Sequence, residues 1–511
     1  GALESISASA VSAGVIWAGS NNGLLHVTRD HGATWRDVTP PSLPLPAVAG
    51  LVAVEASRHN PAEAYVAISY HTRGDYAPYI YRTRDYGQTW TKIVNGLPAA
   101  LTSGAFVRVV REDTKRAGLL FAGTESGVYV SFDDGDSWQS LQLNLPNTSY
   151  RDITVHDNDL VAGTYGRGIW VLDDMSPLRQ MSAGVMAEAV HLFKPGDAVR
   201  LRRNVGSDTP FPAEVPHALN APTGMFVYYA LGQAPSQPVM LDVLDAAGHV
   251  VRHLTSAPQP PVREAAQPPE PNFWIAPPYS IPASAGLNRA VWDLRYDPPP
   301  AFTHSFEINA NPGLTPASPE GALALPGVYT LRLTVDERTY QQTGVVRPDP
   351  RSPATLAQLA AQHGLLMRLT GGIDATWNDF QPVAALKHAV EAAKAGAPDP
   401  IVSAANALAA KIDSVAGEPN ARRGFGGRNA QPTFVSVNAE FVNQLNAQDN
   451  GDMAPTPAAS AAAASACHDL AGVVTRWNTL VSGDLAALDA MLSRQGLATI
   501  AAPAAARGCV Q

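Results

Sequence analysis

Two acidic residues, Asp75 and Glu125, lie in segments whose side chains could act together on a sugar. Asp75 belongs to the polar and aromatic segment HTRGDYAPY (71–79), and Glu125 lies within AGTESGV (122–128). Two carboxylates that face each other across a glycosidic bond can serve as the proton donor and as the base or nucleophile. Solvated loop charges are the alternative interpretation of both residues, and the sequence leaves this choice open.

Further polar and aromatic residues are expected on the same face of the molecule as this carboxylate pair. Aromatic rings beside arginine and amide groups form surfaces that bind sugars or peptides. Short segments of similar composition supply several of them, AGSNNGL (18–24), AGTESGV (122–128) and AGTYGRGI (162–169). The predicted ligand-binding residues are Asn21, Asn22, Arg73, Tyr76, Tyr79, Tyr165 and Arg167.

Other common catalytic patterns are absent from the sequence. The histidines show no metal-ligand spacing, and the chain has no Gly-x-Ser-x-Gly elbow or phosphate-binding loop. We therefore predict neither a metal site nor a cofactor. The net charge of −9 comes without acidic runs and argues against a nucleic-acid partner. No stretch approaches the apolar length of about 18 residues that a transmembrane segment needs.

An internal repeat indicates which elements position these residues. The pattern [Ser/Thr]-x-Asp-x-Gly-x-[Ser/Thr]-Trp occurs as TRDHGATW (28–35), TRDYGQTW (83–90) and SFDDGDSW (131–138), and we call each copy a box. In a box we expect the aspartate to accept hydrogen bonds from its own tight turn, the glycine to adopt a positive φ and the tryptophan to pack between neighbouring sheets. A structural rather than catalytic role is therefore assigned to Asp30, Asp85, Asp133, Trp35, Trp90 and Trp138.

The boxes predict a mainly β protein that begins with a partial β-propeller over residues 1–178. If each box joins the third and fourth strands of a blade, the hairpins between the second and third strands share the opposite face with the loops between blades. The segment 162–174 resembles the end of a blade but lacks a full box. We therefore predict about four blades, three of which carry a box. Because such a set leaves an open fan, we expect an upstream N-terminal polypeptide to complete the propeller.

Beyond this region the sequence pattern changes twice. Strand-like segments with a Pro-rich insertion predict an Ig-like β-sandwich over 190–348. After Pro350 the apolar period becomes helical, which predicts an α-helical bundle over 352–511. Its first helix is expected to start at Ser352 and Pro353, and further helices are expected near 379–395, 399–416, 432–448, 457–480 and 483–494.

The two cysteines, Cys467 and Cys509, both lie in this last region. We predict that they form a disulfide, which requires an oxidising compartment. Two free thiols are the alternative. The predicted location is therefore periplasmic, outer-membrane-associated or secreted, in a bacterium.

The boxes, together with GSNNG (19–23), FVRVVRED (106–113) and WVLDD (170–174), resemble the Asp-box (BNR-repeat) propellers. These propellers occur in sialidases, in two-propeller xyloglucan hydrolases and in sortilin-type receptors. The whole chain is most similar to large exported bacterial proteins of the "glycosyl hydrolase" or sortilin-like type. This resemblance implies the order propeller, Ig-like sandwich and helical region, a seven-bladed ring, and an N-terminal half outside this sequence. The sialidase arginine triad and the cysteine-rich module of sortilin-type receptors are not recognisable.

Three functions remain compatible with these residues. The leading prediction is an exported propeller that recognises a glycan or peptide through its loop face. The first alternative is a glycoside hydrolase with its catalytic carboxylates on that face, and the second is a structural subunit of a cell-envelope complex. Propellers host both binding proteins and enzymes, so the predicted fold does not choose between them.

Overall fold

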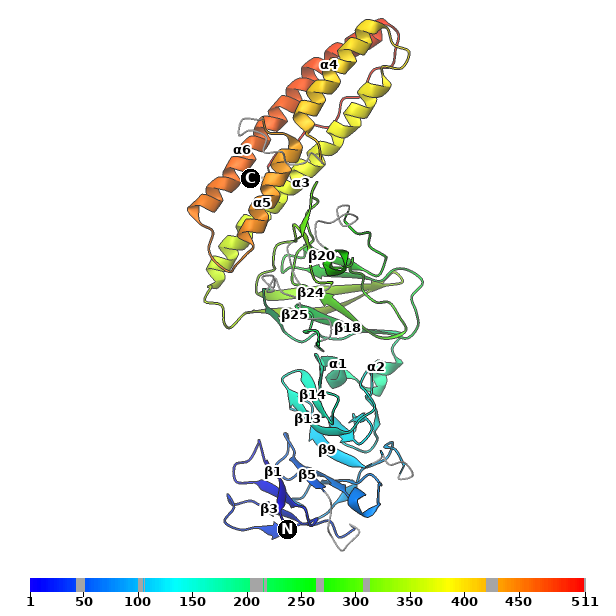
Figure 1. Cartoon of the computed structure of the whole chain (residues 1–511), viewed down its shortest axis with the longest axis vertical. Helices are drawn as coiled ribbons and strands as arrows, with labels where there is room; N and C mark the ends of the chain where they lie inside the picture. Colours follow the sequence, from blue (N-terminus) through cyan, green and yellow to red (C-terminus); the bar gives the residue numbers. More distant parts are fainter. Residues whose placement is uncertain are drawn as a thin grey trace. The chain divides into compact units, whose positions relative to one another are not determined.

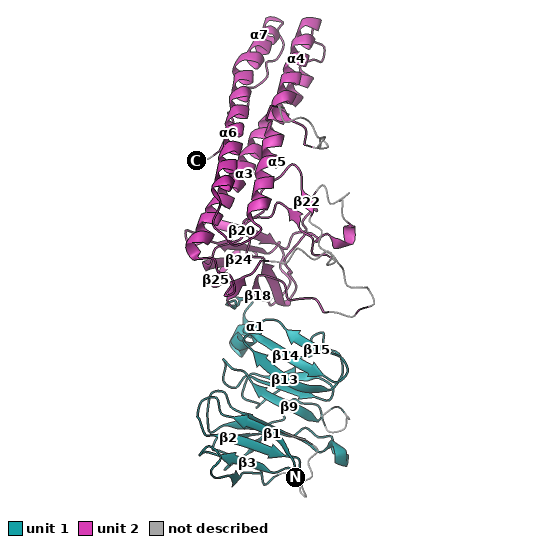
Figure 2. Ribbon diagram, turned by 60° about the vertical axis from the view of Figure 1, so that its left-hand side comes forward, with its two compact units in different colours: residues 1–196 teal, residues 197–511 magenta. Residues whose placement is uncertain are grey.

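The computed structural model describes residues 1–42, 51–99, 104, 106–202, 215, 218–262, 271–306, 313–419 and 431–509 (Figure 1). The chain divides into two compact units, residues 1–196 and 197–511, which Figure 2 draws in teal and magenta. The division into three domains that the sequence suggested stays a prediction.

The described part of unit 1 consists of four consecutive antiparallel sheets, three with four strands and the last with three. The first strands of neighbouring sheets lie side by side, as in the blades of a β-propeller (Figure 2). The mainly β, propeller-like start of the chain is therefore confirmed. The strands of the four blades are β1 (Leu3–Ala8), β2 (Ile16–Ser20), β3 (Leu25–Thr28) and β4 (Arg36–Asp37); β5 (Leu51–Ala56), β6 (Ala64–Ser69), β7 (Ile80–Thr83) and β8 (Thr91–Lys92); β9 (Val107–Glu112), β10 (Leu120–Thr124), β11 (Val128–Ser131) and β12 (Gln139–Ser140); and β13 (Tyr150–His156), β14 (Asp159–Thr164) and β15 (Ile169–Leu172).

Apolar clusters fill the spaces between successive blades. Trp17 and Val66 belong to the cluster between the first and second blades, and Phe121 and Ile153 to the cluster between the third and fourth. A middle blade is covered on both faces, so the strand β6 (AYVAIS) is buried along its whole length and does not alternate with polar residues.

The boxes join the third and fourth strands of their blades, as predicted. In each box the aspartate accepts the backbone N–H of the residue four positions later, at 2.8 Å for Asp30 and 2.9 Å for Asp85 and Asp133. The box glycines have φ values of 91°, 80° and 88°, in chain order, and the residue before each glycine is also left-handed. Two consecutive left-handed residues form the tight turn that the aspartate closes.

Unit 2 begins with two sheets. One holds the antiparallel pair β18-β21, and the five-stranded sheet has the order β17-β25-β24-β19-β20. Trp292 and Tyr329 contact each other from the two sheets, with ring centroids 4.9 Å apart. The strands of unit 2 are β17 (Ala198–Arg200), β18 (Met225–Leu231), β19 (Met240–Leu244), β20 (Val250–Thr255), β21 (Gly286–Trp292), β24 (Gly327–Val335) and β25 (Arg338–Pro348), with a separate pair β22 (Ser305–Phe306) and β23 (Ala317–Ser318). The strand β16 (Val190–Leu192) belongs to unit 1. Residues 263–270 of the predicted Pro-rich insertion lie outside the described residues.

The helical region follows the sheets. The short helices α1 (Ser176–Gln180) and α2 (Ala183–Ala187) belong to unit 1. Two expectations for the long helices were wrong: no helix starts at Ser352, because Thr355 and Gln358 form a capping box, and the segment 379–395 is not a separate helix, because α3 continues through Pro382. The helices are α3 (Leu356–Ala392), α4 (Asp399–Ala416), α5 (Phe434–Gln448), α6 (Pro457–Leu480) and α7 (Ala486–Arg494), with a π-helical segment at Val481–Leu485.

Within unit 2, buried ion pairs join the sheets to the helices. Arg200, which is 2% exposed, bonds Asp452 at 2.6 Å, and Arg202 bonds the same carboxylate oxygen at 2.6 Å. Arg295 bonds Asp449 at 2.6 Å. These links tie the segment between α5 and α6 to the sheets.

The predicted disulfide between Cys467 and Cys509 is confirmed. It fastens the end of the described chain to α6, and Asp379 of α3 accepts the backbone N–H of Arg507 at 2.9 Å beside it. No described helix is long and apolar enough to cross a membrane.

Candidate functional site

The loop face of unit 1 carries a cluster of aromatic and charged side chains from the second, third and fourth blades. These side chains come from the β6–β7 connection, from the starts of β9 and β13 with the residues just before them, and from the β10–β11 and β14–β15 hairpins. We call the set the loop-face cluster. Its members are His71, Tyr76, Phe106, Arg108, Glu125, Ser149, Arg151 and Tyr165.

Glu125 is the anionic centre of this cluster. Arg108 donates a hydrogen bond from Nε to Glu125 Oε2 at 2.8 Å, and Ser149 Oγ donates to the same oxygen at 2.8 Å. Burial opposes ionisation, but these hydrogen bonds outweigh it and hold the pKa of Glu125 below its usual range. Glu125 is therefore a carboxylate at neutral pH and is suited to accept hydrogen bonds or to stabilise positive charge, not to donate a proton.

Phe106 organises the aromatic part of the cluster. The His71 ring stacks on Phe106 at 4.7 Å with an interplanar angle of 4°, and the Tyr76 ring lies 6.1 Å away. The guanidinium of Arg108 lies 4.6 Å from the centre of the same ring. Burial and the nearby Arg108 lower the pKa of His71, so this ring is neutral at neutral pH.

Asp75 is engaged within its own loop. Its carboxylate accepts the Ala77 backbone N–H at 2.9 Å and the Tyr79 hydroxyl at 2.8 Å. Burial and the hydrogen bond to Asp75 raise the pKa of Tyr79, and Lys92 lies 4.2 Å from the centre of the Tyr79 ring. The loop that carries Asp75 reaches the Glu125 cluster through His71 and Tyr76, and a catalytic role for Asp75 and Glu125 as a pair stays a prediction.

The β14–β15 hairpin presents Tyr165 and Arg167. Tyr165 is 69% exposed, and the Arg151 guanidinium lies 4.6 Å from the centre of its ring. The backbone carbonyl of Arg167 accepts the indole N–H of Trp170 at 2.9 Å, which fixes the hairpin. An exposed ring beside a guanidinium forms a stacking platform for a ligand.

The remaining predicted ligand-binding residues lie further along the loop face. Asn21 accepts the backbone N–H of Ala2 at 2.9 Å, and Asn22 bonds Ser20, so both amides support the β2–β3 hairpin. Arg73 is exposed at the end of the 3₁₀ helix His71–Arg73, before the left-handed Gly74. Their roles in binding stay predictions.

Five members of the cluster were not among the predicted site residues: His71, Phe106, Arg108, Ser149 and Arg151. Phe106 and Arg108 lie just before and at the start of β9, and Ser149 and Arg151 lie just before and at the start of β13. The first residues of a blade follow the loop between blades and so reach the loop face. This position relative to the boxes is the signal that could have identified them.

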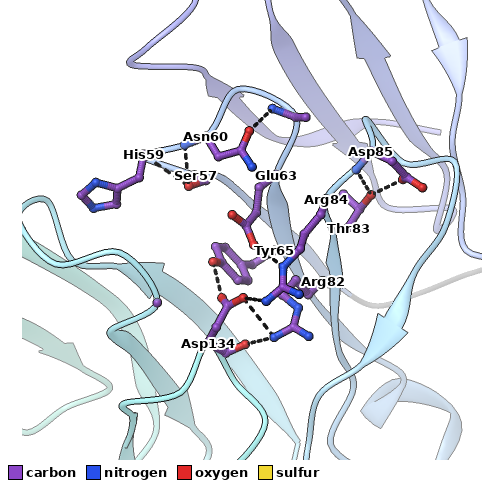
Figure 3. A network of polar contacts seen from close by, with 12 residues as sticks. Ser57, His59, Asn60, Glu63, Tyr65, Arg82, Thr83, Arg84, Asp85 and Asp134 are labelled. Atoms are coloured by element: carbon purple, nitrogen blue, oxygen red, sulfur yellow. Dashed lines mark hydrogen bonds and ion pairs between the residues drawn. The ribbon is translucent and has the colours of Figure 1, made fainter. Parts of the chain in front are cut away.

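A second polar network lies on the box side of unit 1 (Figure 3). Asp134 accepts the Tyr65 hydroxyl at 2.6 Å and pairs with both Arg82 and Arg84, and Arg84 also pairs with Glu63 at 3.2 Å. Burial and the nearby Asp134 raise the pKa of Glu63. Because these charges satisfy one another across two blades, the network serves to join the second blade to the third.

The inner strands of the blades line a polar groove of about 570 Å³. Glu55, which is 4% exposed, pairs with Arg58 at 3.3 Å and Arg111 at 3.5 Å, and Arg111 pairs with Asp152 at 2.7 Å. Burial raises the pKa of Glu55 despite both arginines. Of Glu55 and Asp152, only Asp152 is well exposed, and Arg111 holds it in place.

Comparison with known proteins places the chain near glycan-active enzymes over a limited length. It is 31% identical over 164 residues to an oligoxyloglucan-reducing end-specific xyloglucanase of Emericella nidulans, and the match covers 30% of this chain and 19% of that enzyme. The chain thus spans about a fifth of the length of this curated relative. No family model matches the sequence.

Solved structures overlap with parts of the chain at low similarity. A GH74 xyloglucanase from Xanthomonas campestris covers 67% of this chain and 47% of its own, at 12% identity and a TM-score of 0.27. YCF48 from Cyanidioschyzon merolae covers 34% of this chain and 53% of its own, at 19% identity and a TM-score of 0.25.

Proposed function

We propose that unit 1 recognises a glycan through the loop-face cluster. The observation that carries this proposal is the exposed Tyr165 ring beside Arg151, adjacent to the ionised Glu125 that Arg108 and Ser149 hold in place. Sugar rings stack on aromatic faces, and their hydroxyl groups donate hydrogen bonds to fixed carboxylates. The xyloglucanase relative supports a glycan in preference to a peptide as the ligand.

A glycoside hydrolase that uses Asp75 and Glu125 is the second candidate function. The relative is named as an enzyme that acts on xyloglucan oligosaccharides, which favours this candidate. Glu125, with its lowered pKa, would be the nucleophile or base in such a reaction, and Asp75 would have to supply the proton. Asp75 already accepts hydrogen bonds from Ala77 and Tyr79 within its own loop. Recognition needs no second carboxylate and is therefore the function that we propose first.

The rest of the chain would support this role. We infer that the two-sheet region over 190–348 is an Ig-like spacer and that the helices over 352–511 form a docking bundle. The disulfide supports an exported protein, in the periplasm, at the outer membrane or outside the cell.

Calorimetric titration of the full chain with xyloglucan oligosaccharides tests the proposed recognition, with cello-oligosaccharides and an acidic peptide as comparison ligands. Tyr165→Ala and Arg151→Ala should each weaken glycan binding by about tenfold, as expected for the loss of an interaction of about 1.4 kcal/mol. The matched control is Phe273→Ala, which removes an aromatic ring that is 63% exposed in unit 2. Glycan binding that is unchanged in both loop-face variants would overturn the proposal. Tighter binding of the acidic peptide than of the glycans would show that the ligand is a peptide and not a glycan.

A reducing-sugar assay on the same samples separates recognition from hydrolysis. Release of new reducing ends that is lost in Glu125→Gln and in Asp75→Asn would establish the enzyme. Glycan binding without release, retained in Asp75→Asn, is the outcome expected for a recognition protein.

A further inference from the structure

A groove of about 590 Å³ lies in the helical region of unit 2, where α3, α5 and α6 run side by side (Figure 1). Its floor consists of Leu369 of α3, Phe441 of α5 and Ala463 of α6, all of them buried. The volume is within the range of small-molecule sites, about 300–1,000 Å³. We call this feature the helical groove, and it is large enough to hold a ligand.

The helix α6 supplies the long wall of the helical groove. Ser460, Ala464, His468, Ala471 and Thr475 line it at intervals of three or four residues, which is the spacing of one helix face. From the first to the last of these residues the wall is about 22 Å long, at 1.5 Å per residue. The groove volume spread over this length gives a mean cross-section of about 27 Å², whereas an α-helix with its side chains needs about 80 Å². An extended chain therefore fits the groove, and a helix does not.

The chain segment 507–509 forms another wall of the groove. The disulfide fastens Cys509 to Cys467 of α6, and a Cβ built on Gly508 would lie 3.9 Å from Val474 Cγ2. Asp379 of α3 accepts the backbone N–H groups of Arg507 at 2.9 Å and of Gly508 at 3.2 Å. A covalent bond and two hydrogen bonds therefore hold this wall in place.

The rim of the helical groove is cationic. Arg368, His468 and Arg507 line the groove and are exposed, and no aspartate or glutamate is among its lining residues in the described part of the chain. Within that same part, none of the three basic side chains forms an ion pair, and the nearby Asp379 already accepts two backbone N–H groups. Arginine binds a carboxylate through two parallel hydrogen bonds, and an imidazole N–H can add a third. The rim is therefore suited to an anionic group.

The walls favour an alkyl chain over an extended peptide. The backbone groups of α6 are engaged within the helix, and the Thr475 hydroxyl donates to the Ala471 carbonyl at 2.9 Å. An extended peptide would lay its own N–H and C=O groups against alanine methyl groups and buried rings, where they lack partners, and this is costly. An alkyl chain needs no such partners and gains from leaving water.

We propose that the helical groove binds a single-chain amphiphile that ends in a carboxylate, of the fatty-acid class. Its alkyl chain would lie along α6 on Leu369, Phe441 and Ala463, and its carboxylate would lie at the rim with Arg368, His468 and Arg507. The site is confined to unit 2, so it is independent of the glycan recognition proposed for unit 1. It adds a second, chemically different ligand to the chain.

The test is calorimetric titration of the full chain at pH 7 with dodecanoate, at concentrations below those at which it forms micelles. We expect saturable binding at one site per chain. Dodecyltrimethylammonium, which has the same alkyl chain and the opposite charge, should bind at least about tenfold more weakly, and acetate, which has the same head group and no chain, should not bind measurably.

Substitutions in the groove locate this binding. Ala471→Phe fills the groove without changing its charge and should abolish dodecanoate binding. The matched control is Ala407→Phe, at an exposed alanine of α4, which should bind as wild type does.

A second pair of variants tests the charge of the rim. Arg368→Gln combined with Arg507→Gln should weaken dodecanoate binding by about tenfold or more. Arg494→Gln, which removes an exposed charge at the end of α7, is its control and should leave the affinity unchanged. Thermal unfolding of each variant establishes that it is folded before binding is compared.

Amide exchange of the wild-type chain gives a measurement that needs no variant. Dodecanoate should slow exchange in residues 460–475 and 507–509 and leave α4 unchanged.

Four results would overturn the proposal. The first is the absence of saturable dodecanoate binding to the wild-type chain. The second is equal affinity for the cationic amphiphile or for the folded Ala471→Phe variant, and the third is slowed exchange only outside the groove. The fourth is binding to phosphatidylglycerol vesicles without binding to free dodecanoate, which would make the rim a membrane-contacting surface instead.

Discussion

Arg108 and Glu125 form an ion pair at 2.8 Å between two blade elements, the first strand of the third blade and its β10–β11 hairpin. The arginine side chain is 8% exposed, and that of the glutamate is 28% exposed. The almost buried Arg108 guanidinium therefore holds the ionised Glu125 carboxylate in place on the loop face and balances its charge. This arrangement has consequences for stability as well as for ligand binding.

We predict that Glu125→Gln lowers the free energy of unfolding by about 1.5–3 kcal/mol, the usual value of a hydrogen bond to a charged group. The nearly buried Arg108 would lose its charged partner. Urea unfolding at pH 7 measures the change. Glu188→Gln, which removes the partner of His191 at an exposed site, is the control and should change stability by no more than about 0.5 kcal/mol.

The same pair should respond to acid. The pKa of Glu125 is lower in the folded protein than in the unfolded chain, so its stabilisation is complete above the unfolded pKa of about 4.3 and is lost as the pH falls through the folded pKa. The difference in stability between wild type and Glu125→Gln should therefore shrink below about pH 4. A difference that stays constant from pH 7 to pH 3 would contradict this assignment.

The box aspartates should stabilise the fold without contributing to binding. Asp85→Ala should cost about 1 kcal/mol, because the Thr89 N–H that loses its acceptor lies at the surface and can bond water. Asp469→Ala on α6 is the control. Thermal unfolding and glycan titration are both required, and a variant with unchanged stability and lost binding would give the box a functional role.

Acid should also weaken the boxes. Hydrogen bonds from Thr34 and Thr28 lower the pKa of Asp30 to about 2, and similar bonds lower the pKa of Asp85 and Asp133. The stabilisation from these carboxylates is therefore present above about pH 4 and is lost as the pH falls toward 2. Asp85→Asn should flatten this part of the pH profile of the melting temperature.

Removal of the disulfide should destabilise the helical region. The bond closes a loop with a sequence separation of 42 residues, for which the chain-entropy model gives about 4 kcal/mol. Cys467→Ser with Cys509→Ser should lower the stability of unit 2 and increase amide exchange in residues 497–509. Equal exchange in the oxidised and double-mutant proteins would show that the hydrogen bonds to Asp379 and Asp489 hold this segment without the disulfide.

The ion pairs between the sheets and helices of unit 2 should be essential for its packing. Asp452→Ala would leave Arg200 buried without its carboxylate and should cost about 3–5 kcal/mol. Asp399→Ala, in the first turn of α4, is the control. Chemical unfolding followed by tryptophan fluorescence measures both variants, and equal effects would contradict the inferred role of the pair.

The sequence alone determined the elements whose rules are local. Each box needs an aspartate that accepts the backbone N–H of the residue four positions later, and a glycine that adopts a left-handed conformation. Both requirements lie within eight residues, so the three turns and their positions between strands could be predicted from the sequence. The helices α4, α5 and α6 were also predictable, because an apolar period bounded by proline, glycine or threonine defines a helix within its own segment. The disulfide followed from two cysteines in one region.

Only the tertiary structure decided which side chains meet. Arg108 and Glu125 are separated by 17 residues and His71 and Phe106 lie in different blades, and no local pattern specifies such pairs. Arg200 and Asp452 are 252 residues apart, and their contact unites sheets and helices that the sequence suggested as separate domains. The physical reason is that turns and caps satisfy backbone groups within a few residues, whereas buried charges and stacked rings find partners only when distant segments pack together.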